Sequence, residues 1–263
     1  MEKADSIITE NCASREILAM AYLKKAQCLQ KLEEYEENKG TKKDEFKDIA
    51  GTQEQIKSLV EQALELIPNM PEAIMQMGKM YYKTSASEEG NIEKAINMYA
   101  KAIQLKLDYA AAYNNLGVLY ASEAYSLMKN DNSNLNKAIN EYTEAIRIRP
   151  FDALYYFNRG TDYLKLEKHE KAIEDFSSAI HYGSDEFKRM TFIFYLRGDE
   201  YQSLREYEKA IDDFSESIRL NPAHIRSLLM RGNAYLGLGE KDKAKADLDE
   251  YLRCKRSIEK IAP

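Results

Sequence analysis

The stretch EKAIEDFSSAI, residues 170–180, recurs almost letter for letter as EKAIDDFSESI at residues 208–218. Related blocks begin at four other places: Glu54, Glu93, Asn136 and Asp242. Successive blocks start 34 to 43 residues apart. Recurrence at a period of this size is the signature of a repeat architecture, in which each copy is one small structural unit.

Within residues 170–180, the apolar side chains fall at helical spacing: Ala172, Ile173, Phe176, Ala179 and Ile180. Such a stripe predicts an amphipathic helix with one face in the core. Pro68, Pro150 and Pro222 stand just beyond three of the blocks. Proline cannot donate the hydrogen bond that would continue a helix, so these prolines predict where the block helices end.

A second motif precedes three of the blocks: RGTDY at 159–163, RGDEY at 197–201 and RGNAY at 231–235. The middle copy contains Arg-Gly-Asp, which in an exposed loop would suggest an adhesion ligand. Arginine, glycine and tyrosine persist in all three copies, whereas Asp199 stands at a variable place. We therefore predict that Gly198 is a packing contact in the middle of a helix, and the adhesion reading is disfavoured. Each unit is predicted to be a pair of antiparallel helices.

These residues resemble the tetratricopeptide repeat family. The unit from Thr191 matches that pattern of small, aromatic, alanine and proline positions at Gly198, Tyr201, Ala210, Phe214 and Pro222. The resemblance is close over residues 70–256 and looser over 15–68. It implies an all-α, right-handed superhelical solenoid of antiparallel helix pairs, with the first (A) helices lining the concave side. We expect an N-terminal tail, 1–14, and one solenoid over 15–263 with six units: 19–68, 71–107, 110–150, 153–188, 191–222 and 225–256.

Two departures from the repeat pattern carry predictions. A long insertion between Tyr120 and Asn136 predicts that the A helix of the third unit continues to about Met128. The charged segment 36–51 has no apolar period and is predicted to be a mobile loop.

The composition narrows the compartment and the partners. The chain has 263 residues, a net charge of −6 and 31% charged residues, so no general attraction to nucleic acid or anionic membranes is expected. No apolar run is long enough to span a bilayer. The three cysteines have no zinc-site or disulfide-framework spacing. We expect a cytoplasmic protein without cofactor or metal, and leave open a leader or anchor removed from the chain.

The resemblance implies which residues face the concave groove. In the later units these are unusually apolar, with one amide or carboxylate in each unit. Amides can pair with a peptide backbone as donor and acceptor, and an apolar groove suits a peptide segment. The alternative is that these residues pack against neighbouring helices or a terminal segment. The predicted peptide-binding residues are Asn114, Asn115, Leu154, Phe157, Asn158, Tyr195, Asp199, Arg226, Met230 and Asn233.

Some members of the family hold the C-terminal carboxylate of heat-shock chaperones with a defined set of lysine, asparagine and arginine residues. Here Met75, Val118, Phe192 and Leu196 occupy several of the matching places. The resemblance therefore does not extend to that clamp, and binding to those chaperone tails is disfavoured.

Catalytic motifs are lacking in the sequence. His169, His181 and His224 show no pairing with cysteine or carboxylate at ligand or triad spacing, and His169 is expected to pack between helices. The carboxylates of Glu174–Asp175 and Asp212–Asp213 are expected on solvated helix faces. We predict a non-enzymatic scaffold that binds a protein segment. A chaperone that holds a client on the apolar groove is the alternative, and self-association stays open.

Overall fold

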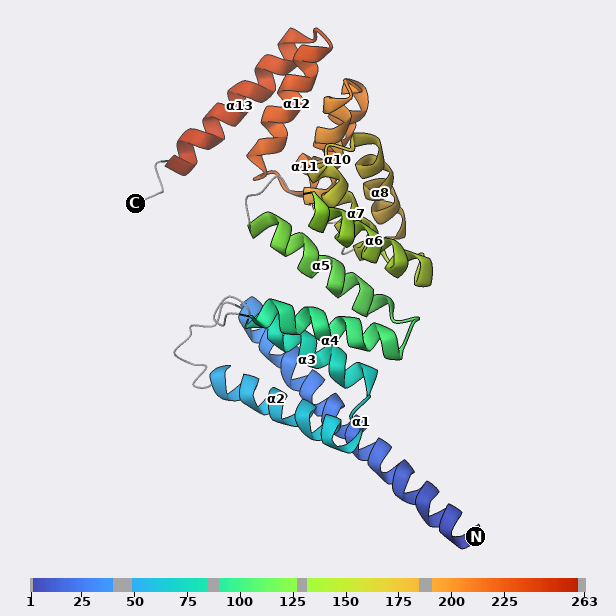
Figure 1. Cartoon of the computed structure of the whole chain (residues 1–263). Coiled ribbons are helices and arrows are strands. Elements are labelled where there is room, and N and C mark those ends of the chain that lie inside the picture. The colour runs from blue at the N-terminus through green and yellow to red at the C-terminus, as the bar shows by residue number, and fades with distance from the viewer. Residues whose placement is uncertain (1, 40–48, 85–89, 127–131, 185–190, 260–263) are drawn as a thin grey trace. The chain divides into compact units, whose positions relative to one another are not determined.

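The computed structural model describes residues 2–39, 49–84, 90–126, 132–184 and 191–259. Throughout these ranges the regular structure is helical, without strands. The helices are α1 (Glu2–Lys39), α2 (Ile49–Leu66), α3 (Pro71–Lys83), α4 (Asn91–Leu105), α5 (Ala110–Ser126), α6 (Ser133–Ile148), α7 (Ala153–Lys165), α8 (His169–Tyr182), α10 (Thr191–Ser203), α11 (Tyr207–Leu220), α12 (Ile225–Gly237) and α13 (Lys241–Glu259) (Figure 1).

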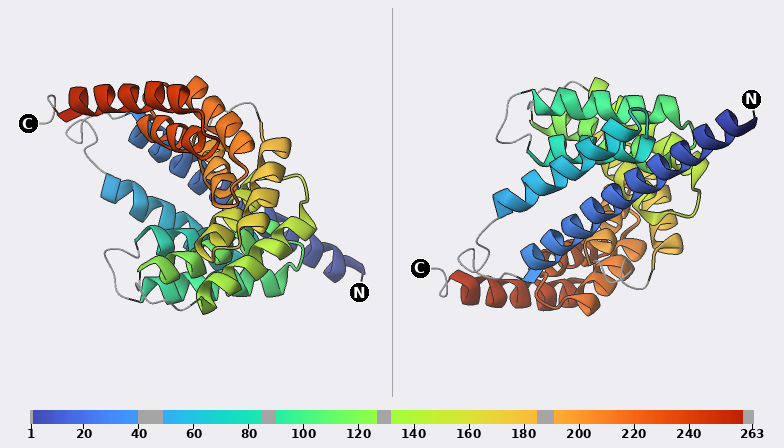
Figure 2. Two further views of the ribbon diagram at one scale, coloured as in Figure 1. Left: turned by 90° about the horizontal axis from the view of Figure 1, so that it is seen from above. Right: turned by 90° about the horizontal axis from the view of Figure 1, so that it is seen from below.

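The chain divides into two compact units, Met1–Leu119 (unit 1) and Tyr120–Pro263 (unit 2). In unit 1, α1 packs on α2 and α3 packs on α4. In unit 2 the pairs are α7 with α8, α10 with α11 and α12 with α13. Figure 2 shows α12 and α13 side by side, and α1 reaching well beyond the end of α2. Successive pairs also touch, α8 against α10 and α11 against α12. This packing of consecutive helix pairs confirms an α-α solenoid.

The helix ends follow the prolines. Helix α2 ends at Leu66, α6 at Ile148 and α11 at Leu220, each two residues before a proline. The three prolines thus stop the second (B) helices of their pairs, as predicted.

The glycines of the recurrent motif allow the two helices of a pair to approach closely. A Cβ atom added to Gly198 would lie 2.9 Å from the ring of Phe214, and one added to Gly78 would lie 2.6 Å from the ring of Tyr99. Real Cβ atoms do not approach other atoms so closely, so a larger side chain would push the helices apart. Gly198 is therefore a mid-helix packing residue, and the adhesion-loop reading of RGDEY is wrong.

The predicted departures from the repeat are partly visible. Helix α5 continues to Ser126, well past Tyr120, and residues 127–131, which include Met128, lie outside the described part. Helix α1 ends at Lys39 and α2 begins at Ile49, so residues 40–48 of the predicted mobile loop also lie outside it. Helix α1 begins at Glu2 and includes the segment expected as an N-terminal tail.

No helix in the described ranges combines the length and the apolar character that crossing a membrane requires.

Candidate functional site

The arginines of the recurrent motif anchor each helix pair of unit 2. In the last three pairs, the A-helix arginine donates two hydrogen bonds, of 2.7 and 2.8 Å, to a B-helix aspartate. The pairs are Arg159 with Asp175, Arg197 with Asp213 and Arg231 with Asp247. The guanidinium plane matches both carboxylate oxygens, which makes such bonds stronger than neutral ones. The motif therefore clamps A to B inside each pair.

The aspartates correct a sequence-based expectation. Asp175 and Asp213 are 2% and 5% exposed and do not lie on a solvated face. Burial raises the pKa of both carboxyl groups, and the arginine opposite each of them opposes that rise. Their chain neighbours Glu174 and Asp212 are the exposed members of these acidic pairs.

The same arginines also reach the preceding pair. Arg159 Nη1 donates to Thr143 Oγ1 of α6, Arg197 Nη1 to Ser177 Oγ of α8, and Arg231 Nη1 to Ser215 Oγ of α11, each at 3.0 Å. One side chain thus ties three helices together.

Two further buried carboxylates occupy matching places on successive A helices, just before the motif tyrosine. Tyr125 Oη donates to Asp162 Oδ1 at 2.6 Å, and Asp162 is 1% exposed. Burial raises the pKa of Asp162 to about 7, while the bond from Tyr125 opposes the rise. In the next pair, His169 Nδ1 lies 2.8 Å from Glu200 Oε2. His169 therefore has a carboxylate partner on the next A helix that the sequence did not indicate.

The third contact of this series is apolar. In place of histidine, α11 begins with Tyr207, whose ring would lie 2.6 Å from a Cβ added at Gly237 of α12. Ala234 occupies the place that Glu200 holds in the preceding pair, and it is buried in a cluster with Ala210. The place before the motif tyrosine is thus polar at Asp162 and Glu200 and apolar at Ala234.

The predicted binding residues of unit 2 come from α7, α10 and α12, and we call this set the A-helix face: Leu154, Phe157, Asn158, Tyr195, Asp199, Arg226, Met230 and Asn233. Leu154 is 46% exposed, and Arg226 and Asn233 are exposed. The other five are half-buried. Burial raises the pKa of Asp199, and the nearby His169 opposes that rise.

The half-buried members of the A-helix face are connected through the core. Phe157 and Tyr195 both pack on the cluster that contains Phe176. Tyr195 also packs with Met230 on the cluster that contains Phe214. One apolar side chain from each of the three A helices therefore packs on two core clusters that share Tyr195, and we call these three side chains the apolar strip. The same helices carry the exposed side chains of Leu154, Phe192 and Leu236.

The other two predicted residues lie in unit 1. Asn114 is 6% exposed, and its Nδ2 donates to Asn115 Oδ1 at 3.4 Å. Asn115 is half-buried and forms a hydrogen bond with Tyr99. Both amides are thus engaged within unit 1.

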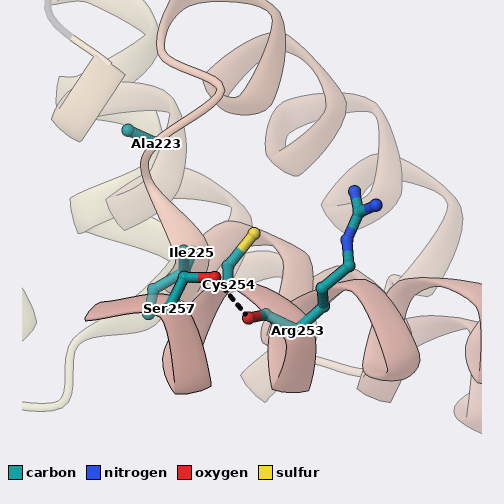
Figure 3. A pocket seen from close by; sticks show the side chains of 5 residues that line it. All are labelled: Ala223, Ile225, Arg253, Cys254 and Ser257. Atoms are coloured by element: carbon teal, nitrogen blue, oxygen red, sulfur yellow. Dashed lines mark hydrogen bonds between the residues drawn. The ribbon is translucent and has the colours of Figure 1, made fainter. Parts of the chain in front are cut away.

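The chain also has open pockets that the sequence did not indicate. One, of about 470 Å³, lies between the start of α12 and the last turns of α13 and is lined by Ala223, Ile225, Arg253, Cys254 and Ser257 (Figure 3). Its one charged group, Arg253, pairs with Glu250 at 2.5 Å, and Ser257 Oγ donates to the Arg253 carbonyl. These groups do not converge on a point where a ligand could be bound. A second pocket, in unit 1, is lined by lysines and glutamines from α1 and α3.

His169 and His224 take part in contacts between helices. Over the residues that the structure describes, no three histidine, cysteine or acidic side chains converge on a metal-sized site. The His169–Glu200 pair links two helices, and the Ser217, His224 and Ser227 side chains are bonded to one another at a contact between pairs.

Comparison with protein families identifies repeats at three places. A TPR repeat model matches residues 88–122, and tetratricopeptide repeat models match residues 192–224 and 225–257. A search of curated protein sequences found no match.

Solved structures share the fold. The pilF protein of Pseudomonas aeruginosa aligns over 91% of this chain and 93% of its own, with 18% identity and a TM-score of 0.65. The protein YrrB, described as a TPR protein with an unusual peptide-binding site, aligns over 75% and 92% with 18% identity and a TM-score of 0.63. The MamA protein aligns over 74% and 96% with 22% identity and a TM-score of 0.61. The recurrent motifs, the paired helices and these three matches show that the chain contains tetratricopeptide repeats.

Proposed function

We propose that the chain is a protein-interaction scaffold that binds a peptide segment of a partner on the A-helix face of unit 2. The repeats and the fold support the scaffold role, since tetratricopeptide repeat proteins generally bind other proteins. The peptide-binding site in the description of the similar protein YrrB is consistent with a peptide ligand.

One observation carries the choice of surface. Phe157, Tyr195 and Met230 form the apolar strip across three A helices, and all three side chains are half-buried. Exposed apolar side chains border it, among them Leu154 at 46% and Phe192 at 50%. Asn158, Asp199 and Asn233 give each of these three helices one polar group. A peptide would place apolar side chains on the strip and its backbone amides on these groups.

The test begins with the selection of binding peptides from a displayed random library against the whole chain. A selected peptide is then titrated by fluorescence anisotropy. Leu154→Glu, and Phe157→Glu with Asn158→Ala, should each weaken binding at least tenfold, because a buried apolar contact contributes about 1.5–3 kcal/mol. Circular dichroism checks that helicity is retained.

The matched control is Phe151→Glu. Phe151 is 73% exposed and precedes α7, outside the A-helix face. This variant should bind like the parent. Peptides that bind the Leu154→Glu chain and the parent equally would refute the proposed surface.

A second function, holding an unfolded client protein, is favoured by the exposed apolar border alone. In that case the chain would suppress the aggregation of a heated model enzyme, and Leu154→Glu with Phe192→Glu would reduce this suppression. The peptide library would then yield no short motif. A defined motif together with no suppression would reject this alternative. Self-association stays a prediction, which sedimentation at two concentrations would test.

A further inference from the structure

Unit 1 carries a polar pocket that is distinct in chemistry from the A-helix face of unit 2. Helices α1 and α3 meet along a polar seam. There Gln76 Nε2 donates to Gln30 Oε1, and Lys83 Nζ lies 3.1 Å from Glu33 Oε1. Gln76 and Glu33 are each 3% exposed. A pocket of about 330 Å³ opens over this seam, lined by Lys24, Gln27, Cys28, Gln30, Lys31, Glu34, Gln76 and Lys79.

The lysines of the pocket differ from their neighbours in having no counter-charge. Lys83 is paired with Glu33, and Lys106 of the same unit lies 3.2 Å from Glu72. Among the described residues, no carboxylate lies within ion-pair distance of Lys24, Lys31 or Lys79. All three side chains are exposed. Three ammonium groups around one opening repel one another, and an anion placed between them would relieve that repulsion.

The single acidic group of the pocket does not cancel this charge. Glu34 stands one turn from Lys31, but its Oε1 accepts a hydrogen bond from Gln30 Nε2 at 3.2 Å. Three lysines against one glutamate leave the lining positive in a chain whose net charge is −6. Local charge of the opposite sign to the whole molecule indicates a place for an anionic ligand.

The glutamines indicate that this anion is part of a peptide. Gln27 is exposed, and its amide has no partner in the part of the chain that the structure describes. A primary amide can donate to a peptide carbonyl and accept from a peptide N–H at once, which a free inorganic anion does not need. The volume is at the small end for ligand pockets, enough for a few side chains.

We propose that the pocket between α1 and α3, lined by Lys24, Lys31 and Lys79, binds a short acidic peptide segment. Its carboxylates approach the three ammonium groups, and Gln27 pairs with its backbone. The site shares no residue with the A-helix face of unit 2.

The experiment titrates fluorescein-labelled hexaglutamate into the whole chain at low ionic strength, with hexaglutamine as the neutral probe. We expect hexaglutamate to bind and hexaglutamine not to bind, with affinity falling as salt is added because the charges are exposed. Lys31→Glu with Lys79→Glu should weaken binding roughly tenfold or more, because two exposed ion pairs are lost and two repulsions are added.

The matched control is Lys101→Glu, which changes another exposed lysine, on α4 and outside the pocket lining. It should change the affinity less than twofold, and Phe151→Glu in unit 2 should leave hexaglutamate binding intact. Equal loss in the Lys101 variant would show attraction to surface lysines in general and would overturn the proposal. Unchanged binding after the double charge reversal, or inorganic phosphate competing as tightly as the peptide, would overturn it as well. None of these outcomes depends on whether unit 2 binds its own peptide.

Discussion

Arg197 serves two helices at once, through Asp213 of its own pair and Ser177 of the pair before it. Removing it leaves Asp213 buried and unpaired, which is far more costly than losing an ion pair in water.

We expect Arg197→Ala to lower the free energy of unfolding by about 3–5 kcal/mol, a loss typical of breaking a buried pair. The matched variant is Arg219→Ala, which removes an exposed pair with Glu216 and should cost far less, because water screens exposed pairs. Urea unfolding of both variants measures the difference. Equal losses would mean that the arginine clamp contributes no more than a surface pair.

The clamp also marks a limit of sequence reasoning at this scale. Asp175 and Asp213 each follow another acidic residue, and one polar pair looks like any solvated helix surface. Adjacent helical residues point in different directions, so one of the two can be buried while the other is not. The constant separation of 16 residues between arginine and aspartate was the available signal. In the third repeat the matching places hold Leu116 and Glu141. Where the arginine is missing, the aspartate is missing as well.

At the scale of elements, Asp162 makes the contact between α5 and α7 sensitive to pH. Its ordinary pKa is 3.8, and burial raises it to about 7. Below pH 4 the carboxyl is protonated in both the folded and the unfolded chain. Between pH 4 and 7 the unfolded chain loses this proton while the folded chain keeps it, so this group makes the fold less stable as pH rises.

We expect Asp162→Asn to reduce this loss, because the amide stays neutral and its oxygen still accepts from Tyr125. A shift of this size corresponds to about 4 kcal/mol between low and high pH, as an order of magnitude. Urea unfolding at pH 4.5 and pH 8 should show the variant gaining stability relative to the parent at the higher pH. A constant difference between the two chains across that range would contradict the role of Asp162.

The contact between α8 and α10 offers a second test. It is polar, through His169 and Glu200, whereas the matching contact between α11 and α12 is apolar. His169→Tyr alone should destabilise the chain by about 1–3 kcal/mol, because Glu200 loses its partner and the new ring meets Ser203. Adding Glu200→Ala and Ser203→Gly copies the arrangement of Tyr207, Ala234 and Gly237 and should restore most of the loss. Thermal unfolding compares the single and triple variants, and a triple variant less stable than the single one would show that the contacts are not equivalent.

The elements themselves were largely predictable. The spacing of Ala172, Ile173 and Phe176 predicted a helix, and Pro222 predicted where one ends. The periodicity could not separate a side chain that faces a ligand from one that faces the next helix. Phe157 and Tyr195, for example, were predicted to face a ligand and are partly packed in the core. The lysine pocket of unit 1 was not predicted, because its residues come from two helices and the first repeat matches the motif only weakly.

For the whole molecule, stability should be close to a sum over pairs and their contacts, since each pair touches chiefly its neighbours. Ile56 is 1% exposed in the core of α1 and α2, and Ile56→Ala should cost about 2–5 kcal/mol there. Hydrogen exchange should then accelerate in α1 and α2 far more than in α10–α13. Uniform acceleration along the chain would indicate a single all-or-none fold.

The arginine that reaches back to the preceding pair also bears on how such arrays can be lengthened by design. Thr143, Ser177 and Ser215 receive that arginine inside unit 2, whereas α13 presents Asp249 at the matching place. A copy of the α12–α13 module grafted behind α13 would bring its guanidinium against a carboxylate instead of a hydroxyl. The artificial joint would thus be ionic where the natural joints are neutral, and an engineer could tune it with salt.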